Sequence, residues 1–314
     1  MSDLEPQAER VGTAASLMAH FAERTGLVSD SDQQVRYLWT DAFAVCNFLG
    51  LAQLDHEEAH RRSALRLVDD VHRTLGRHRP DDPRSGWISG LPEEEGTEHP
   101  TRGGLRIGKP RGERGSHEHF DEHLEWERDG QYFHYSTKWM HALSRVATAT
   151  GEPRYLRWAI DLARATYAGF VRTAPDGSRR LAWKMSIDLS RPLVPSAGHH
   201  DPLDGLITFL ELRSAAATRF AGSSLETLDD EIAALRGMTR GIDWATADPL
   251  GLGGLLADCE RLLRLVVRGG SRDLDLLERL FDAALTSLAA PGQSDGPGGA
   301  AATRLAFREL GLAI

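Results

Sequence analysis

The sequence has only 2 cysteines in 314 residues. Cys46 and Cys259 lie inside apolar helical patterns, without a CxxC motif or a zinc-type Cys/His spacing, which argues against a disulfide framework or a zinc finger. The sequence also lacks an uninterrupted apolar run of about 18 residues, the minimum for a transmembrane helix. Its first ten residues are polar and acidic, unlike a secretory signal. We therefore expect a soluble, cytoplasmic protein that does not enter a membrane.

Positive charge is also in short supply. Lys and Arg number 37 against 46 Asp and Glu, so the net charge is −9. No basic field would attract DNA or RNA, and we expect no nucleic-acid partner. The glycine-rich stretch 103–109 lacks the GxxxxGK[ST] order of a phosphate-binding loop and follows no strand. We therefore expect no organic cofactor.

Strand-like segments are nearly absent, and the best candidate is Arg180–Met185. Apolar residues instead recur at helical spacing along most of the chain, which indicates an all-α fold. The stretch at 37–49 is apolar nearly all round, whereas 65–75 is amphipathic. The periodicity predicts helices at about 8–24, 37–49, 65–75, 133–150, 155–171, 203–220, 225–238, 250–267, 274–288 and 299–311.

The predicted helices form pairs with unequal connections. Links within pairs are short, whereas the links between pairs include two long insertions, at 77–129 and 175–200. If helices alternate in direction, all links between pairs emerge at one end of the fold. Long loops in compact domains usually carry function. We therefore expect a single domain over residues 1–314, with both insertions forming its functional face.

The pair at Gln131–Val171 places a small-residue helix, a TGEPRYL turn and an amphipathic helix in succession. This pattern resembles the repeating hairpin of (α/α)6-toroid proteins, such as the N-acylglucosamine 2-epimerase family and the six-hairpin glycosidases. Residues 39–75 show a weaker version of it. The resemblance implies an (α/α)-hairpin toroid, a barrel of about six helix pairs. About eleven helices can be counted, fewer than the twelve of a complete toroid. Either one helix lies hidden in 77–129, or the first and last helices combine as one hairpin and the ring is irregular.

The second insertion leads into the sharpest candidate site. His200 and Asp201 precede Pro202, which is typical of the first turn of a helix, and Asp201 is a candidate N-cap as well as a catalytic group. His200 sits in a tight polar bend, where a site role is favoured over burial. The nearby residues Trp183, Lys184 and Asp188 are further candidates for substrate binding or catalysis.

The first insertion ends in a second group of candidates. His134, Lys138 and His141 share one face of the predicted helix 133–150, and Gln131 lies one turn earlier. A polar stripe on an otherwise apolar inner helix indicates a cavity wall or a satisfied buried network. Glu125 and Asp129, which precede this helix, are candidate catalytic carboxylates, although Asp129 is also a candidate cap.

The remaining candidates are aromatic or charged residues near the same face. Indole rings stack on the apolar faces of sugar rings, and cationic side chains bind carboxylates. These candidate binding residues are Trp39, Asp41, Trp87, Arg106, Lys109 and Trp139, and Trp126 adjoins them. The histidines of the HEHFDEH cluster, His117, His119 and His123, match no standard zinc spacing, so we expect a charged loop and no metal.

These residues point to a carbohydrate-active enzyme whose substrate is a sugar or sugar acid. A glycoside hydrolase would use two of the carboxylates Glu125, Asp129, Asp188 and Asp201 as acid and base. A sugar epimerase or isomerase would use His134 and His200 to move a proton next to a carbonyl. The resemblance favours histidine chemistry in the epimerase-like families.

Two other functions compete with these. Helical toroids also house terpene cyclases and prenyl-substrate enzymes, whose aromatic walls stabilise carbocations. The acidic pairs in this sequence form no DDxxD or DxDD motif. A non-catalytic scaffold that binds a ligand is the third possibility; it predicts a flat patch, whereas an enzyme predicts a concave pocket. The sequence leaves the oligomeric state open.

Overall fold

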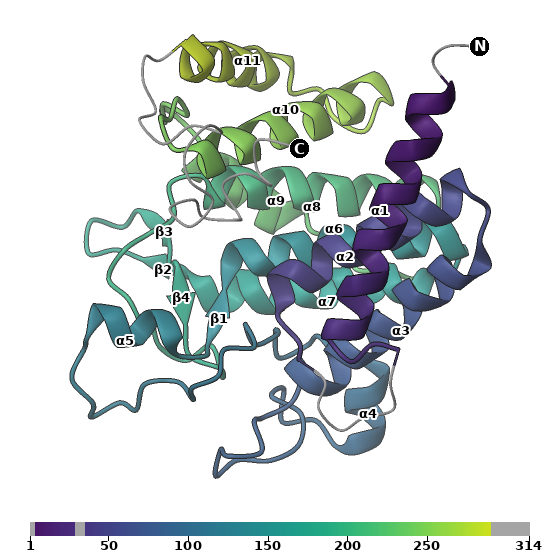
Figure 1. Cartoon of the computed structure of the whole chain (residues 1–314). Helices are drawn as coiled ribbons and strands as arrows, with labels where there is room; N and C mark the ends of the chain where they lie inside the picture. The colour runs from purple at the N-terminus through teal and green to yellow at the C-terminus, as the bar shows by residue number, and fades with distance from the viewer. Residues whose placement is uncertain (1–3, 29–34, 290–314) are drawn as a thin grey trace.

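The computed structural model describes residues 4–28 and 35–289, and most of these residues are helical (Figure 1). This confirms the all-α expectation; the helix expected at 299–311 lies outside the described residues. The described helices are α1 (Leu4–Arg24), α2 (Leu38–Leu54), α3 (Glu58–Leu75), α4 (Glu93–Glu98), α5 (Glu122–Glu127), α6 (Phe133–Thr150), α7 (Pro153–Phe170), α8 (Asp201–Thr218), α9 (Asp229–Met238), α10 (Pro249–Val267) and α11 (Leu274–Ala289).

Four short strands accompany the described helices. Strand β1 (Gln131–Tyr132) pairs with β4 (Lys184–Met185), and β2 (Val171–Thr173) pairs with β3 (Arg179–Leu181), both antiparallel. The single strand expected at Arg180–Met185 is therefore split between two ribbons. The expected helix 155–171 also ends one residue early, because Val171 pairs with Leu181 in the β2–β3 ribbon.

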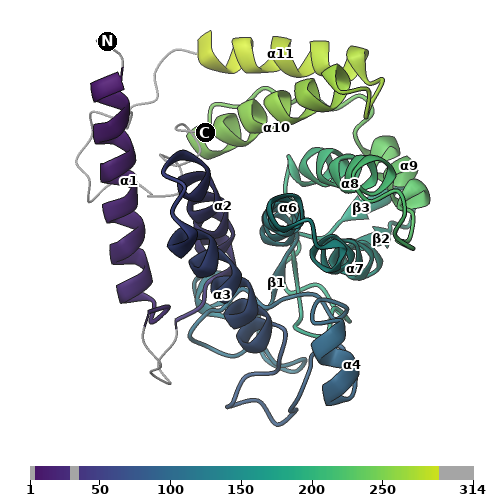
Figure 2. The same cartoon turned by 90° about the vertical axis from the view of Figure 1, so that its right-hand side faces the viewer.

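Consecutive long helices form hairpins. The contacting pairs are α2–α3, α6–α7, α8–α9 and α10–α11. Across these pairs, α2 contacts α6, α6 contacts α8, and α8 contacts α10, so the first helix of each hairpin belongs to one inner row. Figure 2 shows α10 and α11 above α2, α6 and α8, with α1 beside α2. The four helices of the inner row border the cavity that is described below.

Sequence explains which helices are inner. Helix α2 is apolar nearly all round and contacts α1, α3 and α6, so several of its faces are buried. Helix α3 is strongly amphipathic and buries one face. The turn between α6 and α7 needs Gly151, whose φ of 75° ends α6 in the left-handed conformation. Pro153 then begins α7.

The two insertions contact each other through Gln131. Its side-chain Nε2 donates to the carbonyl oxygens of Gly103 at 2.9 Å and Ile187 at 2.7 Å, and its Oε1 accepts from the Leu105 amide at 2.9 Å. Gly104 has a φ of +79°, and a Cβ there would lie 2.0 Å from Gln131 Oε1. The insertions expected at one end therefore form one hydrogen-bonded layer. Within 77–129 the helices α4 and α5 have only 6 residues each.

Candidate functional site

The inner helices enclose a cavity of about 1220 Å³, called here the central cavity. Most of its lining residues fall on one side of each helix, as expected when a helix borders a space. Helix α2 contributes positions 39, 43 and 46, α6 positions 134, 138, 141, 144, 145 and 148, α8 positions 201, 204, 211, 214, 215 and 218, and α10 positions 250, 251, 254, 257, 258, 260, 261, 264 and 265. Arg219 and Arg268, which directly follow α8 and α10, line it as well.

The imidazole of His134, at the start of α6, is held by aromatic rings. It stacks on Tyr132 with ring centroids 5.2 Å apart and on Trp183 at 6.2 Å. Trp39 and Tyr135 meet it edge-on at 5.9 Å and 4.9 Å. Rings on several sides restrict the rotation of the imidazole, which pre-organises His134 beside the cavity.

Asp201, at the start of α8, faces this histidine. Its Oδ1 lies 3.7 Å from His134 Nδ1, and within the described residues neither Nδ1 nor Asp201 Oδ2 has a hydrogen-bond partner, although both are buried. The Asp201 carboxylate does not cap α8, because the N-cap is His200 and no side chain caps this end. A separation of 3.7 Å is longer than a hydrogen bond, and a ligand hydroxyl can bridge it. Both atoms therefore keep hydrogen-bonding capacity that the described residues do not use.

Gly198 makes room for the Asp201 carboxylate. A Cβ at position 198 would lie 2.4 Å from Asp201 Cγ and Oδ2. Gly198→Ala should therefore displace the carboxylate and lower the free energy of unfolding by about 1–3 kcal/mol, measured by urea denaturation. Gly254→Ala is the control, because Gly254 also lines the cavity and a Cβ there meets no atom within 4 Å. Equal stability losses in both variants would contradict this packing account.

His200 is fixed beside the same cavity. Its Nε2 lies 3.1 Å from the carbonyl oxygen of Trp244, and burial lowers the pKa of His200. Because a carbonyl oxygen only accepts, Nε2 carries the proton and Nδ1 keeps its lone pair. At neutral pH His200 is therefore a neutral base.

Deeper in the cavity, Arg261 of α10 joins three carboxylates. Its Nη1 donates to Asp204 Oδ1 at 3.0 Å and Asp258 Oδ1 at 3.1 Å, and its Nη2 donates to Glu211 Oε2 at 2.6 Å. Lys138 Nζ also donates to Asp204 Oδ1, at 2.8 Å. His141 Nδ1 lies 3.0 Å from Glu211 Oε2. We call these six residues the Arg261 cluster.

The Arg261 cluster shifts the pKa values of two of its carboxylates, Asp204 and Asp258, in opposite directions. Burial acts to raise the pKa of Asp204, but Lys138 and Arg261 hold that pKa below its ordinary value. Burial raises the pKa of Asp258, and the nearby Asp204 carboxylate raises it further. Asp258 is therefore the member that retains a proton most readily, which is the property of a general acid.

Six of the residues proposed from sequence line the central cavity. They come from α2, α6, α8 and the second insertion, and the cavity brings them together although the chain separates them: Trp39, His134, Lys138, Trp183, His200 and Asp201. The residues that sequence reasoning left out of the candidate set are Asp204, Glu211, Asp258 and Arg261.

The candidate carboxylates of the first insertion form buried ion pairs and do not line this cavity. Glu125 pairs with Lys184 at 2.9 Å and with Arg114 at 3.0 Å. Lys184 Nζ also donates to the carbonyl oxygens of Glu125 and Arg128. Asp129 Oδ2 pairs with Arg106 at 2.5 Å, so it does not cap α6. These pairs hold the insertion together.

The other candidates outside the cavity also have structural contacts. Trp139 is fully buried and donates from Nε1 to His72 Nε2 at 3.1 Å. Trp87 packs under Arg77, and Lys109 lies over the ring of Tyr37. Gln131 is the clamp between the insertions described above.

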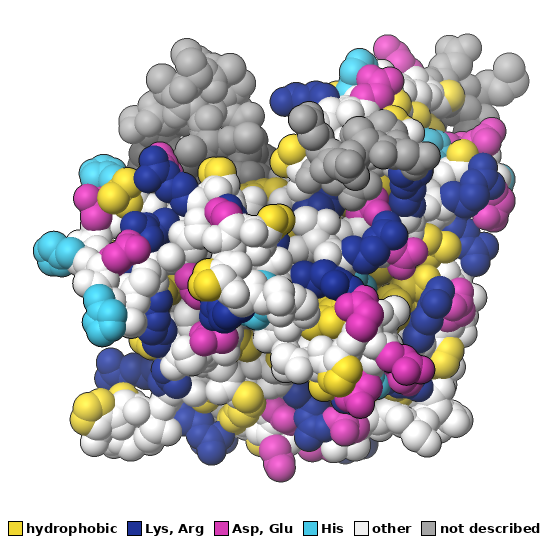
Figure 3. All heavy atoms as spheres, turned by 90° about the horizontal axis from the view of Figure 1, so that it is seen from below, with side chains coloured by type: hydrophobic (Ala, Val, Ile, Leu, Met, Phe, Trp, Pro, Cys, Tyr) yellow, Lys and Arg dark blue, Asp and Glu magenta, His cyan; other side chains and the backbone are white. Residues whose placement is uncertain are grey.

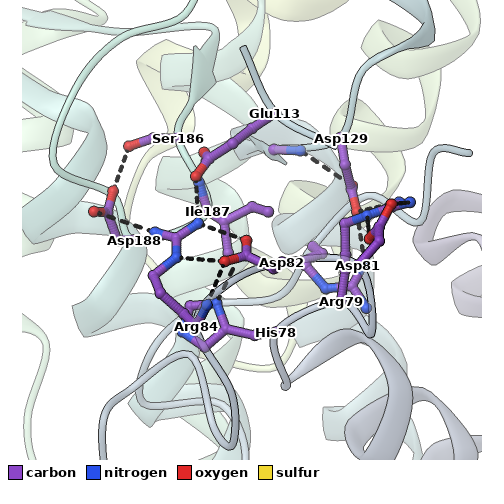
Figure 4. Close-up of polar contacts among 12 residues, drawn as sticks. His78, Arg79, Asp81, Asp82, Arg84, Glu113, Asp129, Ser186, Ile187 and Asp188 are labelled. Carbon is purple, nitrogen blue, oxygen red and sulfur yellow. Dashed lines mark hydrogen bonds and ion pairs between the residues drawn. The ribbon is translucent and has the colours of Figure 1, made fainter. Parts of the chain in front are cut away.

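Asp188 belongs to a network of ion pairs in the insertion layer (Figure 4). It accepts from the hydroxyls of Ser186 and Ser190 and lies 3.6 Å from Arg84. Arg84 also pairs with Asp82 and Glu113. Each carboxylate in this network has a partner. Asp188 therefore makes its contacts within the insertion layer, and it does not line the central cavity.

Asp41 lies outside the lining and gives a pH prediction. Burial raises its pKa from 3.8 to about 7. Between these values the folded state binds more protons than the unfolded state, so this group's contribution to stability falls as pH rises. When the pH is lowered from 7 to 5, the wild type should therefore gain stability relative to Asp41→Asn. The expected gain in its free energy of unfolding is about 1–2 kcal/mol. Urea denaturation at both pH values measures this shift; a difference that is constant with pH would contradict it.

The histidines of the HEHFDEH loop are exposed on the first insertion. Among the described residues, no group of three or more His, Cys, Asp or Glu side chains is arranged to hold a metal ion. The face in Figure 3 shows basic and acidic side chains interspersed rather than a field of one sign. This surface therefore offers no concentrated charge for a ligand.

With the geometry established, the chain was compared with known proteins. No protein-family model matches the chain, and the comparison with curated proteins gave no significant match. None of the described helices combines the length and the apolar character needed to cross a membrane. The central cavity is therefore the feature from which a function can be inferred.

Proposed function

We propose that the protein is an enzyme that moves a proton at a carbon next to a carbonyl group of a sugar or sugar acid, as an epimerase or isomerase does. The observation that carries this proposal is a pair of buried atoms, His134 Nδ1 and Asp201 Oδ2, that have no hydrogen-bond partner among the described residues and belong to a cavity bordered by Trp39 and Trp183. This combination supplies a base, a hydroxyl acceptor and apolar faces for a sugar ring.

The residues take separate roles in this proposal. Trp39 and Trp183 contact the apolar face of the ring, and Asp201 accepts a hydrogen bond from a hydroxyl. A base removes the proton next to the carbonyl, and the electron pair moves onto the carbonyl oxygen to form an enediolate. An imidazolium, formed when one of the two histidines takes up a proton from the sugar or from solvent, then returns a proton to carbon, and the carbonyl forms again. His134 is one base, because its buried Nδ1 has no hydrogen-bond partner among the described residues. His200, a neutral base, is the other.

The arrangement of the inner helices supports a toroid as the scaffold. We infer that α2, α6, α8 and α10 form part of an (α/α)-hairpin barrel, because each contacts the next and each is the first helix of a hairpin. The resemblance of Gln131–Val171 to toroid hairpins points the same way. The paired helices α3, α7, α9 and α11 would form the outer layer.

A glycoside hydrolase is the second candidate, and the raised pKa of Asp258 favours it. Glu125, Asp129 and Asp188 are held in ion pairs outside the cavity, so the acid and base would be Asp258 and Asp201. A prenyl substrate fits less well, because carboxylates and guanidinium groups line the cavity along its length.

The test is a screen in D₂O followed by NMR. The protein is incubated with aldoses, ketoses, N-acylated amino sugars and uronic acids, and separately with aryl glycosides. We expect deuterium to enter one sugar at the carbon next to the carbonyl, with an epimer or isomer formed. Hydrolysis of a glycoside without deuterium incorporation would replace the proposal with the second candidate. Failure of every sugar to react or to raise the melting temperature would contradict both.

A further inference from the structure

The central cavity carries a second group of charged residues at the end opposite His134. His134, Asp201 and Leu250 lie in the first turns of α6, α8 and α10, and Arg145, Arg219 and Arg268 lie in or just after the last two turns of the same helices. All of these residues line one cavity. The cavity therefore has a proton-transfer end and a guanidinium end.

The carboxylates that line the cavity contact other groups, and none of them contacts these three arginines in the described part of the chain. Asp204, Glu211 and Asp258 contact Arg261, and Glu260 contacts Arg264. Asp201 faces His134, and Asp248 caps α10. Within residues 4–28 and 35–289, Arg145, Arg219 and Arg268 have neither an ion pair nor a side-chain hydrogen bond. Arg145 is half-buried, and the other two are exposed.

We propose that this end of the central cavity is an anion subsite that binds the phosphate group of an elongated ligand. A guanidinium binds oxyanions through paired N–H donors. Three positive charges exceed what one carboxylate neutralises, whereas a phosphate monoester carries about −1.5 to −2 at pH 7 and presents three acceptor oxygens. The chemistry therefore favours phosphate over carboxylate.

The length of the cavity sets the shape of the ligand. Eleven residues separate His134 from Arg145 on α6, which is about 16 Å at a rise of about 1.5 Å per residue. The cavity volume of about 1220 Å³ exceeds that of typical small-molecule pockets, ~300–1,000 Å³. The inference that one ligand reaches both ends of the cavity rests on the proposed function. Phosphate binding at the guanidinium end is independent of it.

The arginines also lie at the negative ends of helix dipoles, which they stabilise without any ligand. The two roles differ in their dependence on phosphate. A dipole role predicts that each substitution lowers the melting temperature equally in phosphate and in chloride. A subsite predicts that phosphate raises the melting temperature of the wild type and that the substitutions remove this increase.

The experiment measures inorganic phosphate binding to the full chain by calorimetry and thermal unfolding, at constant pH and ionic strength. Arg145→Gln should weaken phosphate binding about 10- to 100-fold, because it removes charge-assisted hydrogen bonds. Arg157→Gln should leave binding unchanged; Arg157 is a half-buried arginine on α7 outside the cavity lining. The triple variant of Arg145, Arg219 and Arg268 should bind no phosphate.

Two further arms complete the test. Acetate should bind at least about tenfold more weakly than phosphate; equal binding would overturn the assignment of a phosphate group. His134→Asn should keep the phosphate affinity of the wild type, which shows that the two ends act separately. Absence of phosphate binding to the wild type would overturn the subsite and leave the proposed function standing, whereas intact phosphate binding with no sugar chemistry would overturn the proposed function alone.

Discussion

His134→Asn should lower kcat for the sugar identified in the D₂O screen by about 10²–10⁴-fold, the usual contribution of a general base. Asparagine keeps a polar group of similar size between Tyr132 and Trp183 but cannot take up a proton at neutral pH. The rate of deuterium incorporation measures the loss directly. The melting temperature should change little, because the buried Nδ1 of His134 has no hydrogen-bond partner among the described residues.

A variant of Asp201, which faces His134, tests the role of His134 further. Asp201→Asn should also lower kcat, and the double variant should lose far less than the product of the two effects, because the groups act as a unit. His60→Asn is the matched control: His60 Nε2 lies 3.1 Å from Asp55 Oδ2, a closer His–Asp pair outside the cavity lining. A wild-type rate in His134→Asn, or the same loss in His60→Asn, would contradict the assigned role.

Arg261→Met should lower the free energy of unfolding by about 3–5 kcal/mol, the cost of removing one partner from a buried ion pair. Methionine approximates the volume of the arginine stem but leaves Asp204, Glu211 and Asp258 without their shared cation. Glu211 is affected most, because burial acts to raise its pKa and Arg261 is the main group that holds that pKa below its ordinary value, whereas Asp258 already retains a proton readily. Urea denaturation at pH 7 measures the loss.

Arg264→Met provides the comparison on the same helix. Arg264 is exposed and pairs only with Glu260 among the described residues, so its substitution should cost about 0–1 kcal/mol. If Arg261→Met and Arg264→Met were equally stable, the Arg261 cluster would not hold α10 against α8. A loss in Arg261→Met that disappears at low pH would instead support the account, because protonated carboxylates no longer need the cation.

Helical periodicity was sufficient to predict the all-α class and most of the long helices. The long helices were expected within a few residues of their observed bounds, because each buries an apolar face at a spacing that a single sequence displays. The start of α3 was missed by seven residues, since its first turns from Glu58 are charged and carry little apolar signal. The ribbons β1–β4 and β2–β3 were not predicted as such, because strands of two or three residues depend on distant partners.

The candidate site was predictable only in part. A segment rich in polar residues is typical of a functional site, but it is also typical of a buried ion-pair network. The identities of the residues alone do not distinguish these two structures. Lys184 and Asp129 illustrate this ambiguity: both lie in the polar insertions, and both are fully buried in ion pairs. The Lys184–Glu125 pair joins residues 59 positions apart and forms only when the two insertions meet. The Arg106–Asp129 pair forms within the first insertion, between residues 23 positions apart.

A signal for the Arg261 cluster was present in the sequence. Asp204, Thr208 and Glu211 recur at the spacing of one helical face on α8, like His134, Lys138 and His141 on α6. Asp258 and Arg261 also share a face of the apolar helix α10. A polar stripe on an apolar helix predicts a cavity wall or a buried network, and applying this rule to every helix would have identified these residues.

The most direct test of the account is a crystal structure of the protein with the sugar that reacts in the D₂O screen. The account predicts density for the sugar ring in the central cavity, against Trp39 and Trp183, with a hydroxyl within hydrogen-bond distance of Asp201 and the reacting carbon beside His134. A sugar bound instead on the surface of the 77–129 insertion, with the central cavity empty, would contradict it.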